Sequence, residues 1–388
     1  MSEYFEEFFD GHAFDFQVEK QKVIDNLNWL KSLSVEEFTF YKKWEEIQEY
    51  GDLIGDSKQV KAQLWSPSNI DDPVQTIKEI ETLSPRVVYV DTPELQKSWL
   101  NLRVFCHSAD YNQVPGRYRK FLIMDGDRYL GFLAVGSDII ATDARDSWIG
   151  WNKETREGGK LTFSAVGSTI APTQPLGYNF LGGKLCALLV TSQVVRDNWK
   201  KSYGNTLTGM TTTSLYGSLS QYNNLKWWHK CGHSKGKVLI KPDQRFYKIW
   251  HDWLKTNRSE EYIKAMTQKE GVSGPVTGAK LRVLDMICDV VGIKVSDYQH
   301  GYSRGIFYSC FYNNTKEFLR GEIKENDLII KDIMNEECML SWWKNKAVER
   351  YKKLILEKRI KIEKLFYNKM FGMKYTKAKE IYFSEVGR

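Results

Sequence analysis

Runs of apolar residues divide the middle of the chain into short strands and helices. "RVVYV" (86–90) is typical of a short buried strand, and the Thr-Pro-Glu that follows it predicts a capped helix start, with the helix covering 92–106. The β-rich runs 120–124 and 128–135 flank the dipeptide Asp125-Gly126, which tolerates a positive φ. We therefore predict a strand, a helix and an antiparallel hairpin, in that order.

The pattern continues with alternating element types. A strand is predicted over 161–168, and the prolines after it delay the next helix, whose apolar positions recur every three or four residues over 184–203. A Thr-rich strand (206–217) follows, then a short helix ended by Gly232 and a last strand. This order predicts an α/β (α+β) protein with a mixed, mostly antiparallel sheet flanked by helices.

The two ends of the chain have a helical pattern. Ser34 and Glu37 form a capping box inside the N-terminal region. Towards the other end, helices are predicted around 247–254 and 281–291 and one more strand at 305–312, before a C-terminal helical segment. We divide the chain into an N-terminal helical region, a core, a mixed helical region with one added strand and a basic helical tail, at 1–84, 85–241, 242–343 and 344–388.

Composition places the chain among ordinary globular proteins, with 42% hydrophobic and 27% charged residues. No apolar run reaches the roughly 18 residues that a membrane span needs. The acidic, aromatic start "MSEYFEEFFDG" has no basic segment of the kind that opens a signal peptide. The six cysteines contain no Cys-x-x-Cys pair. We expect a protein of the bacterial cytoplasm with reduced thiols, no membrane association and no bound metal.

Positive charge is concentrated at the C-terminal end. The net charge is +7, whereas 344–388 alone contains 14 Lys/Arg and 5 Asp/Glu. Basic side chains interleaved with aromatic ones suit a polyanion, DNA more than RNA. The alternative is a solvated helix whose apolar positions pack on the body of the protein. The cations proposed to contact nucleic acid are Lys352, Lys353, Lys358, Arg359, Lys361 and Lys364.

The stretch "PLGYNFLGGKL" (175–185) is a glycine-bearing turn before a helix. It is not a Walker loop, because Lys184 comes one position late and Leu185 stands where a hydroxyl is needed. Backbone N–H groups at such a helix start favour an anion. The alternative is that both glycines serve only close packing.

The block "RDSWIGW" and the tyrosines after the Thr-rich strand supply the candidate catalytic groups. Arg145 and Asp146 beside Trp148 and Trp151 could orient a substrate or hold a base, or could simply support the turn. Tyr216 or Tyr222 could act as a general acid, although a tyrosine in so aromatic a chain is more often part of the core.

One group of histidines and a cysteine has the chemistry of a zinc site. His229, Cys231 and His233 carry ligand atoms that zinc accepts. On a helix ending at Gly232 they do not face one point, and no fourth ligand stands nearby in the sequence. We expect no metal there.

The order of elements resembles the acyl-CoA-dependent N-acetyltransferase (GNAT) fold. In that fold a central strand diverges from its neighbour and a glycine turn holds the pyrophosphate of coenzyme A. The resemblance implies an acyl-CoA, such as acetyl-CoA, as the cofactor, with Tyr222 and Asn223 on a late helix. The residues that it assigns to cofactor binding are Val166, Ser168, Gly177, Tyr178, Asn179, Gly182, Gly183, Lys184 and Asn223.

A second resemblance covers roughly 85–240. "RYLGFLAVGSDIIATDARDSWIGWNKETREGGKL", with "NWKKSYG" ending a helix before a strand, is similar to the DruA family of the Druantia anti-phage system. The chain departs from the family pattern after the strand, where "LTFSAVGSTIAP" replaces an Asn-Asn-x-Arg-Phe-like run, which puts a shared active site in doubt. The resemblance implies a phage or mobile-element setting.

These observations leave three hypotheses. The first is an acyl-CoA-dependent transferase that modifies DNA bases or a nucleic-acid-associated amine. The second is a non-catalytic nucleic-acid-binding module of a defence, counter-defence or replication system. The third is a structural or assembly protein. Binding of acetyl-CoA and salt-dependent binding of DNA distinguish them.

Overall fold

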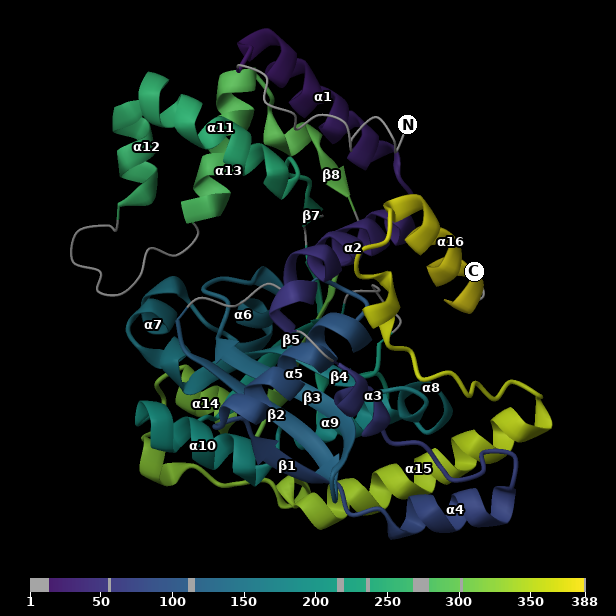
Figure 1. Cartoon of the computed structure of the whole chain (residues 1–388). Coiled ribbons are helices and arrows are strands. Elements are labelled where there is room, and N and C mark those ends of the chain that lie inside the picture. Colours follow the sequence, from purple (N-terminus) through teal and green to yellow (C-terminus); the bar gives the residue numbers. More distant parts are fainter. Residues whose placement is uncertain are drawn as a thin grey trace. The chain divides into compact units, whose positions relative to one another are not determined.

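The computed structural model describes residues 14–54, 57–110, 116–214, 220–234, 238–267, 279–300 and 303–386 (Figure 1). The chain divides into two compact units, each built from segments far apart in the sequence. Unit 1 takes its residues from 1–41, 236–302 and 374–388, and unit 2 from 42–235 and 303–373. The four-region division at 84, 241 and 343 stays a prediction.

Unit 2 is built on a seven-stranded sheet with the order β1-β2-β3-β4-β5-β9-β6. Neighbouring strands are antiparallel except β4 and β5, which are parallel. The strands are β1 (Arg86–Tyr89), β2 (Tyr118–Asp125), β3 (Arg128–Ser137), β4 (Ser164–Pro172), β5 (Gly209–Ser214), β6 (His229–His233) and β9 (Gly305–Cys310). The predicted fold class, a mixed and mostly antiparallel sheet flanked by helices, is confirmed.

The parallel pair at the centre of the sheet is short. Only three residue pairs join β4 to β5, from Ser164↔Gly209 to Val166↔Thr211. Beyond this point β4 continues along β3 and β5 continues along β9. The two parallel strands therefore diverge after Val166.

Helices cover both faces of this sheet. Leu133 and Val135 of β3 belong to the same buried cluster as Leu185 and Leu188 of α9 (Gly182–Leu189). Phe132, on the opposite face, contacts Trp99 of α5 (Pro93–Cys106) with ring centroids 6.5 Å apart. The alternation of side chains along a strand explains why each helix contacts every second residue.

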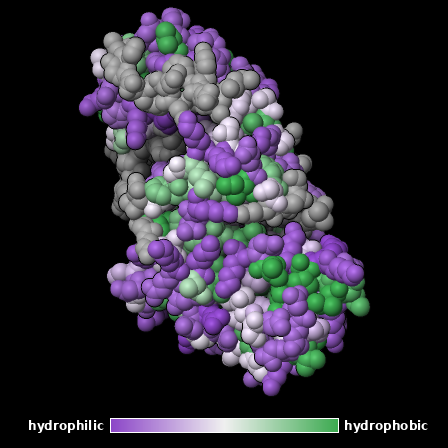
Figure 2. Space-filling view, turned by 45° about the vertical axis from the view of Figure 1, so that its right-hand side comes forward, coloured by the Kyte–Doolittle hydropathy of each residue, from purple (hydrophilic) through white to green (hydrophobic). Residues whose placement is uncertain are grey.

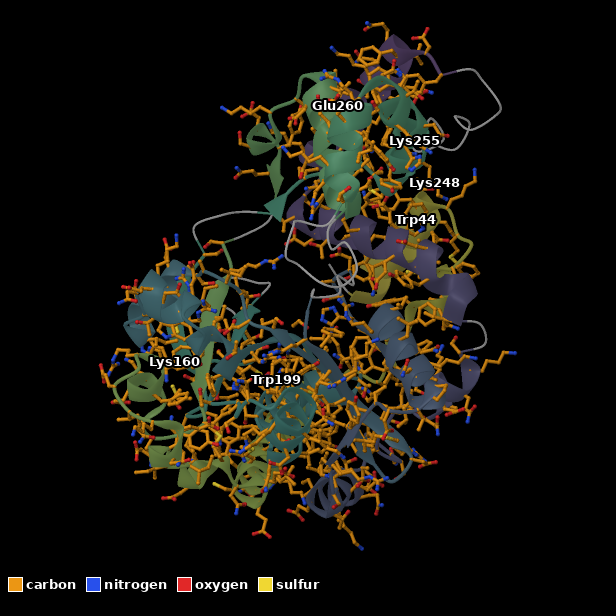
Figure 3. The ribbon with its side chains drawn as sticks, turned by 90° about the vertical axis from the view of Figure 1, so that its left-hand side faces the viewer. Trp44, Lys160, Trp199, Lys248, Lys255 and Glu260 are labelled. Atoms are coloured by element: carbon orange, nitrogen blue, oxygen red, sulfur yellow. The ribbon has the colours of Figure 1, made fainter. Side chains whose placement is uncertain are left out.

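The other helices of unit 2 pack around these layers. Trp199 of α10 lies in the interior (Figure 3). These helices are α3 (Lys58–Ala62), α4 (Pro73–Thr82), α6 (Asp143–Ile149), α7 (Lys153–Glu157), α8 (Leu176–Asn179), α10 (Gln193–Tyr203), α14 (Thr315–Leu319) and α15 (Glu336–Leu356), with a 3-10 turn η2 (Lys160–Phe163). No described helix combines the length and apolar character that crossing a bilayer demands.

Unit 1 is mainly helical. Its helices are α1 (Phe16–Ser32), the first turns of α2 (Val35–Ile54), α11 (Gln244–Asn257), α12 (Ser259–Met266), α13 (Ala279–Val291) and α16 (Tyr375–Val386), with the two-stranded pair β7 (Val238–Leu239) and β8 (Gln299–His300). Buried Asp243 accepts hydrogen bonds from Asn26 Nδ2 at 2.6 Å and Tyr41 Oη at 2.7 Å. Phe40 stacks on Tyr382 with centroids 4.3 Å apart. These contacts tie the three chain segments together.

Local signals predicted their elements well. Thr92 caps α5 through the N–H of Leu95, and Ser34 and Glu37 exchange the two hydrogen bonds of a capping box. Gly126 has a φ of 57° in the hairpin turn, and Gly204 a φ of 75° where α10 ends. These predictions are confirmed.

Three predicted elements were wrong in detail. Residues 229–233 form the edge strand β6, not a helix ending at Gly232, because they pair with β9. The helix predicted over 184–203 is two helices, α9 and α10. The strand predicted over 161–168 begins at Ser164 after a 3-10 turn and runs on to Pro172, because β3 pairs with it along that length.

Candidate functional site

A chain of buried ion pairs runs through α6. Arg145 Nη1 lies 2.9 Å from Asp138 Oδ1, and its Nη2 lies 2.7 Å from Asp146 Oδ1. The second oxygen of Asp146 lies 2.7 Å from Nη1 of Arg156. Arg145 has no exposed surface. The predicted catalytic pair Arg145 and Asp146 therefore contact each other, and their charges are balanced by two residues that the sequence reasoning missed.

Asp138, which directly follows β3, connects this chain to the sheet. Its Oδ2 accepts hydrogen bonds from Thr211 of β5, at 2.9 Å, and from Ser164 of β4. Ser164 Oγ lies 3.1 Å from the hydroxyl of Tyr308 on β9. Burial raises the pKa of Asp138, with Arg145 opposing the shift, and burial raises the pKa of Tyr308 well above 10. The network holds α6 against three strands.

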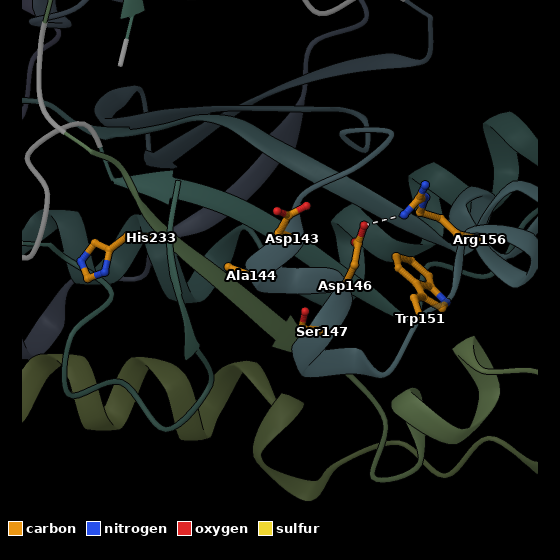
Figure 4. Close-up of a pocket in the computed structure, with 7 residues that line it drawn as sticks. All are labelled: Asp143, Ala144, Asp146, Ser147, Trp151, Arg156 and His233. Carbon is orange, nitrogen blue, oxygen red and sulfur yellow. Dashed lines mark hydrogen bonds and ion pairs between the residues drawn. The ribbon is translucent and has the colours of Figure 1, made fainter. Parts of the chain in front are cut away.

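One side of α6 lines a pocket of about 570 Å³ (Figure 4). Asp143, Asp146 and Ser147 occupy positions i, i+3 and i+4 of the helix and so share a face. The pocket is lined by Asp143, Ala144, Asp146, Ser147, Trp151, Arg156 and His233. Arg156 is only 9% exposed, and its Nε has no hydrogen-bond partner in the described part of the chain. The pocket thus combines carboxylates with one buried donor.

An aromatic pair lies at the neighbouring junction of α6 and β6. The ring of His229 stacks on Trp148 with centroids 4.4 Å apart and planes 17° from parallel. Lys316 Nζ is 4.5 Å from the centre of the Trp148 ring. Burial, followed by repulsion from Lys316, lowers the pKa of His229. His229 is therefore a neutral, exposed ring at pH 7.

The glycine turn contacts other parts of the chain. Lys184 Nζ donates to the carbonyls of Gln221, at 3.3 Å, and Asn223, at 2.5 Å. A Cβ added at Gly183 would lie 2.4 Å from Gln221 Oε1, and one at Gly182 would lie 2.9 Å from Pro172. Close packing against Pro172 therefore accounts for Gly182, whereas a side chain at Gly183 would meet the movable end of Gln221.

Side chains also bridge the diverging strands β4 and β5. Gln221 Nε2 donates to the carbonyl of Ile170, at 2.9 Å, and Thr212 Oγ1 to that of Gly167, also at 2.9 Å. Val166 is buried in the sheet between β3 and β5, and Ser168 is exposed, with its hydroxyl 3.4 Å from the carbonyl of Ala134.

Tyr222 closes the same gap. Its hydroxyl lies 3.3 Å from Thr212 Oγ1 and 3.1 Å from Gln221 Nε2, and burial raises its pKa to about 12. It is a neutral phenol that belongs to the core. Tyr216, the other candidate acid, lies outside the described residues.

The glycine turn (175–185) and the basic segment, by which we mean residues 344–364, lie some 170 residues apart in the sequence and contact each other in the fold. Arg350 and Lys361 lie over the ring of Tyr178, at 5.3 and 5.0 Å from its centre, and Arg359 Nη2 is 3.3 Å from its hydroxyl. Asn179 fixes the arrangement by bonding both backbone groups of Lys361. We call Tyr178, Arg350, Arg359 and Lys361 the Tyr178 cluster.

The remaining predicted cations lie near this cluster in the sequence but differ in role. Lys352, Lys353 and Lys358 are exposed. Lys364 instead donates to the carbonyl of Leu64 at 3.0 Å, and burial lowers its pKa. Helix α15 ends at Leu356 and α16 begins at Tyr375, so the tail 344–388 is not one continuous helix, and Ile362 and Leu365 lie between the two. Figure 2 shows hydrophobic side chains in several patches of a mostly hydrophilic surface. Leu356 and Ile362 are 85% and 63% exposed.

The finding that residues 229–233 form strand β6 gives no support to a zinc site there. His229 and His233 serve different features, the aromatic pair and the pocket. Over the described ranges, no group of three or more His, Cys, Asp or Glu is placed to hold a metal ion.

Sequence reasoning missed Asp138, Arg156, Ser164 and Tyr308. A carboxylate directly after the apolar strand β3 is the one signal that could have drawn attention to Asp138, because a charge at a strand end beside a buried arginine needs a partner. The other three residues stand 18 to 170 residues away, Ser164 and Tyr308 on strands of the sheet and Arg156 on α7, and become neighbours only in the folded chain.

The chain is similar to known proteins over the region that contains α6 and the seven-stranded sheet. The family model described as "Druantia protein DruA" matches residues 41–321, which is more than half of the chain. A relative in Escherichia coli (strain UMEA 4076-1), also described as Druantia protein DruA, is 27% identical over 289 residues, covering 68% of each chain. No solved structure matches the chain significantly. The matched range contains the ion-pair chain, the pocket and the aromatic pair, and the chain belongs to the DruA family.

Proposed function

We propose that this protein acts in anti-phage defence by binding nucleic acid, DNA more than RNA, through the Tyr178 cluster and the basic segment that carries it. Family membership supports the defence setting. The observation that carries nucleic-acid binding is the convergence of three cations on one tyrosine ring. The proposal takes up the second of the hypotheses drawn from the sequence.

The charge balance of the cluster favours a polyanion. Between Lys344 and Lys364 the chain has nine Lys/Arg and three Asp/Glu. Glu357 pairs with Arg359 at 2.9 Å and lies 3.6 Å from Lys353, so one carboxylate serves two cations. Like charges held close together repel each other, and a bound phosphate relieves that repulsion. Neutralisation of the phosphates also releases the counterions that surrounded the nucleic acid.

The arrangement also provides directional contacts. Arg359 is exposed and presents a planar guanidinium that can bond two phosphate oxygens at once. Lys361 is positioned by Asn179 through its backbone, so its side chain stays available to a ligand. Phosphate contacts of this kind fix a protein on DNA without reading sequence. We therefore expect that binding of duplex DNA through the Tyr178 cluster depends little on base sequence.

The test is the salt dependence of binding to a fluorescent DNA duplex. In the variant Arg359→Gln/Lys361→Gln, the slope of log affinity against log salt should become shallower by about 0.9 for each phosphate that the variant no longer neutralises. Lys58→Gln/Lys61→Gln, which removes two lysines of α3, is the matched control and should leave the slope unchanged. Equal slopes for both variants and the original protein, or no binding of DNA at all, would contradict the proposal.

An acyl-CoA-dependent transferase is the second candidate. The observation that favours it is the divergence of β4 and β5 after three residue pairs, next to a glycine turn. In that reading the cofactor would take the place of Gln221, with Tyr222 as the acid. It receives less support, because Gln221 and Thr212 already bridge the gap by bonding carbonyls of β4, and Lys184 Nζ is bonded to the carbonyls of Gln221 and Asn223. Calorimetric titration with acetyl-CoA distinguishes the two candidates. If no heat of binding is observed, the transferase hypothesis is rejected, whereas the DNA-binding proposal is unaffected.

A further inference from the structure

We propose that the junction of α6 and β6 binds an unpaired nucleotide, with the base in the α6 pocket and a neighbouring base against the His229–Trp148 pair. The inference deepens the proposed function, on which it rests, because it names nucleic acid with unpaired bases as the preferred ligand. It concerns a surface separate from the Tyr178 cluster.

The polar groups of the pocket suit a base rather than a phosphate. Asp143 is exposed and lines the pocket, so a phosphate there would be repelled. A carboxylate accepts hydrogen bonds from the exocyclic amino groups of bases. Arg156 provides a donor instead of an acceptor. Its buried Nε–H has no hydrogen-bond partner within the described residues. An amino group beside an acceptor atom is the pattern that cytosine, adenine and guanine present, whereas thymine has no amino group.

The size of the pocket is consistent with this ligand. A volume of about 570 Å³ falls within the range of roughly 300–1,000 Å³ typical of small-molecule sites. The ring of Trp151 forms one wall, and Arg145 lies behind it with its guanidinium carbon 5.2 Å from the ring centre. The ion-pair chain holds Asp146 and Arg156 in place, so the pocket walls are fixed before a ligand arrives.

The aromatic pair supplies the second contact. His229 is exposed and already stacks on Trp148, so the outer face of its ring is available to a base. Base–aromatic stacking is sequence-tolerant and requires that the base be unpaired. Lys316, beside Trp148, and exposed Lys230 provide cations for the backbone.

Two residue pairs place the pocket and the aromatic pair side by side. On α6, Ser147 lines the pocket and the next residue, Trp148, forms the aromatic pair. On β6, His233 lines the pocket and His229 stacks on Trp148. Between the two histidines, a Cβ added at Gly232 would lie 3.1 Å from Ala144, which shows how closely β6 approaches α6. Successive bases of a single strand could therefore occupy both.

The experiment compares single-stranded and duplex DNA of one length in competition against a labelled strand. We expect the protein to prefer the single strand, and strands of dC or dA over dT. Asp143→Asn and His229→Ala should each weaken single-strand binding by about tenfold while leaving duplex affinity unchanged. Both residues are exposed and lie outside the buried ion-pair chain, so folding should be retained, as thermal unfolding would verify. Asp127→Asn, in the hairpin turn, is the matched control.

Each other result overturns one proposal or the other. Equal affinity for single strand and duplex, or variants that weaken both alike, would refute the unpaired-nucleotide site while the Tyr178 cluster stands. If neither DNA form binds, the proposed function fails. Titration with free dCMP and TMP then tests whether the pocket binds a nucleotide by itself. Binding of dCMP that is lost in Asp143→Asn would support the pocket as a nucleotide site. If neither nucleotide binds, the pocket is not such a site.

Discussion

The ion-pair chain of α6 and the Tyr178 cluster use the same kinds of charged side chain with opposite results. In the chain, charges alternate in sign, Asp138, Arg145, Asp146, Arg156, and all four residues are at most 9% exposed. In the cluster, three cations surround one ring at the surface. Alternation satisfies charges within the fold, whereas a surplus of one sign leaves them for a ligand. The comparison separates residues that hold the site from residues that bind.

Removal of Arg145 gives the largest expected effect. Arg145→Met leaves Asp138 and Asp146 buried without their shared partner, which costs about 3–5 kcal/mol of unfolding free energy. Urea unfolding followed by tryptophan fluorescence measures the decrease. Arg128→Met, at an exposed position of the hairpin, is the control and should change stability by less than about 0.5 kcal/mol. A decrease below about 1 kcal/mol for Arg145→Met would mean that the chain is not structural.

A third group of charged side chains, in which His107 lies among cations, extends the comparison. We expect it to make the stability of the fold sensitive to acid. Burial, with Arg103 and Lys43 adding repulsion, lowers the pKa of His107 well below 6.5. Below pH 6.5 the unfolded chain therefore binds a proton that the folded one does not, and stability is lost as the pH falls. In His107→Asn this part of the pH dependence should disappear, while an asparagine can still accept from the N–H of Ala109. Identical stability profiles between pH 5 and 7 would rule out His107 as the cause.

The smallest effect on stability is expected at the Tyr178 cluster. Arg359→Gln/Lys361→Gln removes charges at exposed positions, so the midpoint of urea unfolding should stay close to that of the original protein. The same urea titration measures it. A decrease in the midpoint as large as that of Arg145→Met would place these cations with the structural group and would remove the basis for DNA binding there.

The comparison also explains what the sequence could predict. Elements governed by neighbours along the chain were predictable: the Asp125-Gly126 hairpin, the Thr92 cap and the helix end at Gly204 depend on a few adjacent residues. The identity of β6 was not, because its partner β9 lies some 70 residues further on and supplies the hydrogen bonds that make a strand. Composition alone indicated the basic segment, but its meeting with Tyr178 required the tertiary fold.

The candidate site follows the same division. Arg145 and Asp146 stood out as charges beside tryptophans, yet their partners Asp138 and Arg156 come from a strand end and from another helix. The glycine turn was recognisable, but the side chains that pack against it come from the segment around Gln221. Long-range neighbours decide whether a charged or flexible segment is satisfied internally, and one sequence does not contain them.

The position of Gln221 has a consequence for the central sheet. Its side chain spans the opening where the two parallel strands diverge and donates to a main-chain oxygen of β4 there. The gap between β4 and β5 is therefore bridged by a side chain from a distant part of the same chain, and the sheet is closed across its parallel pair by a contact that no strand supplies.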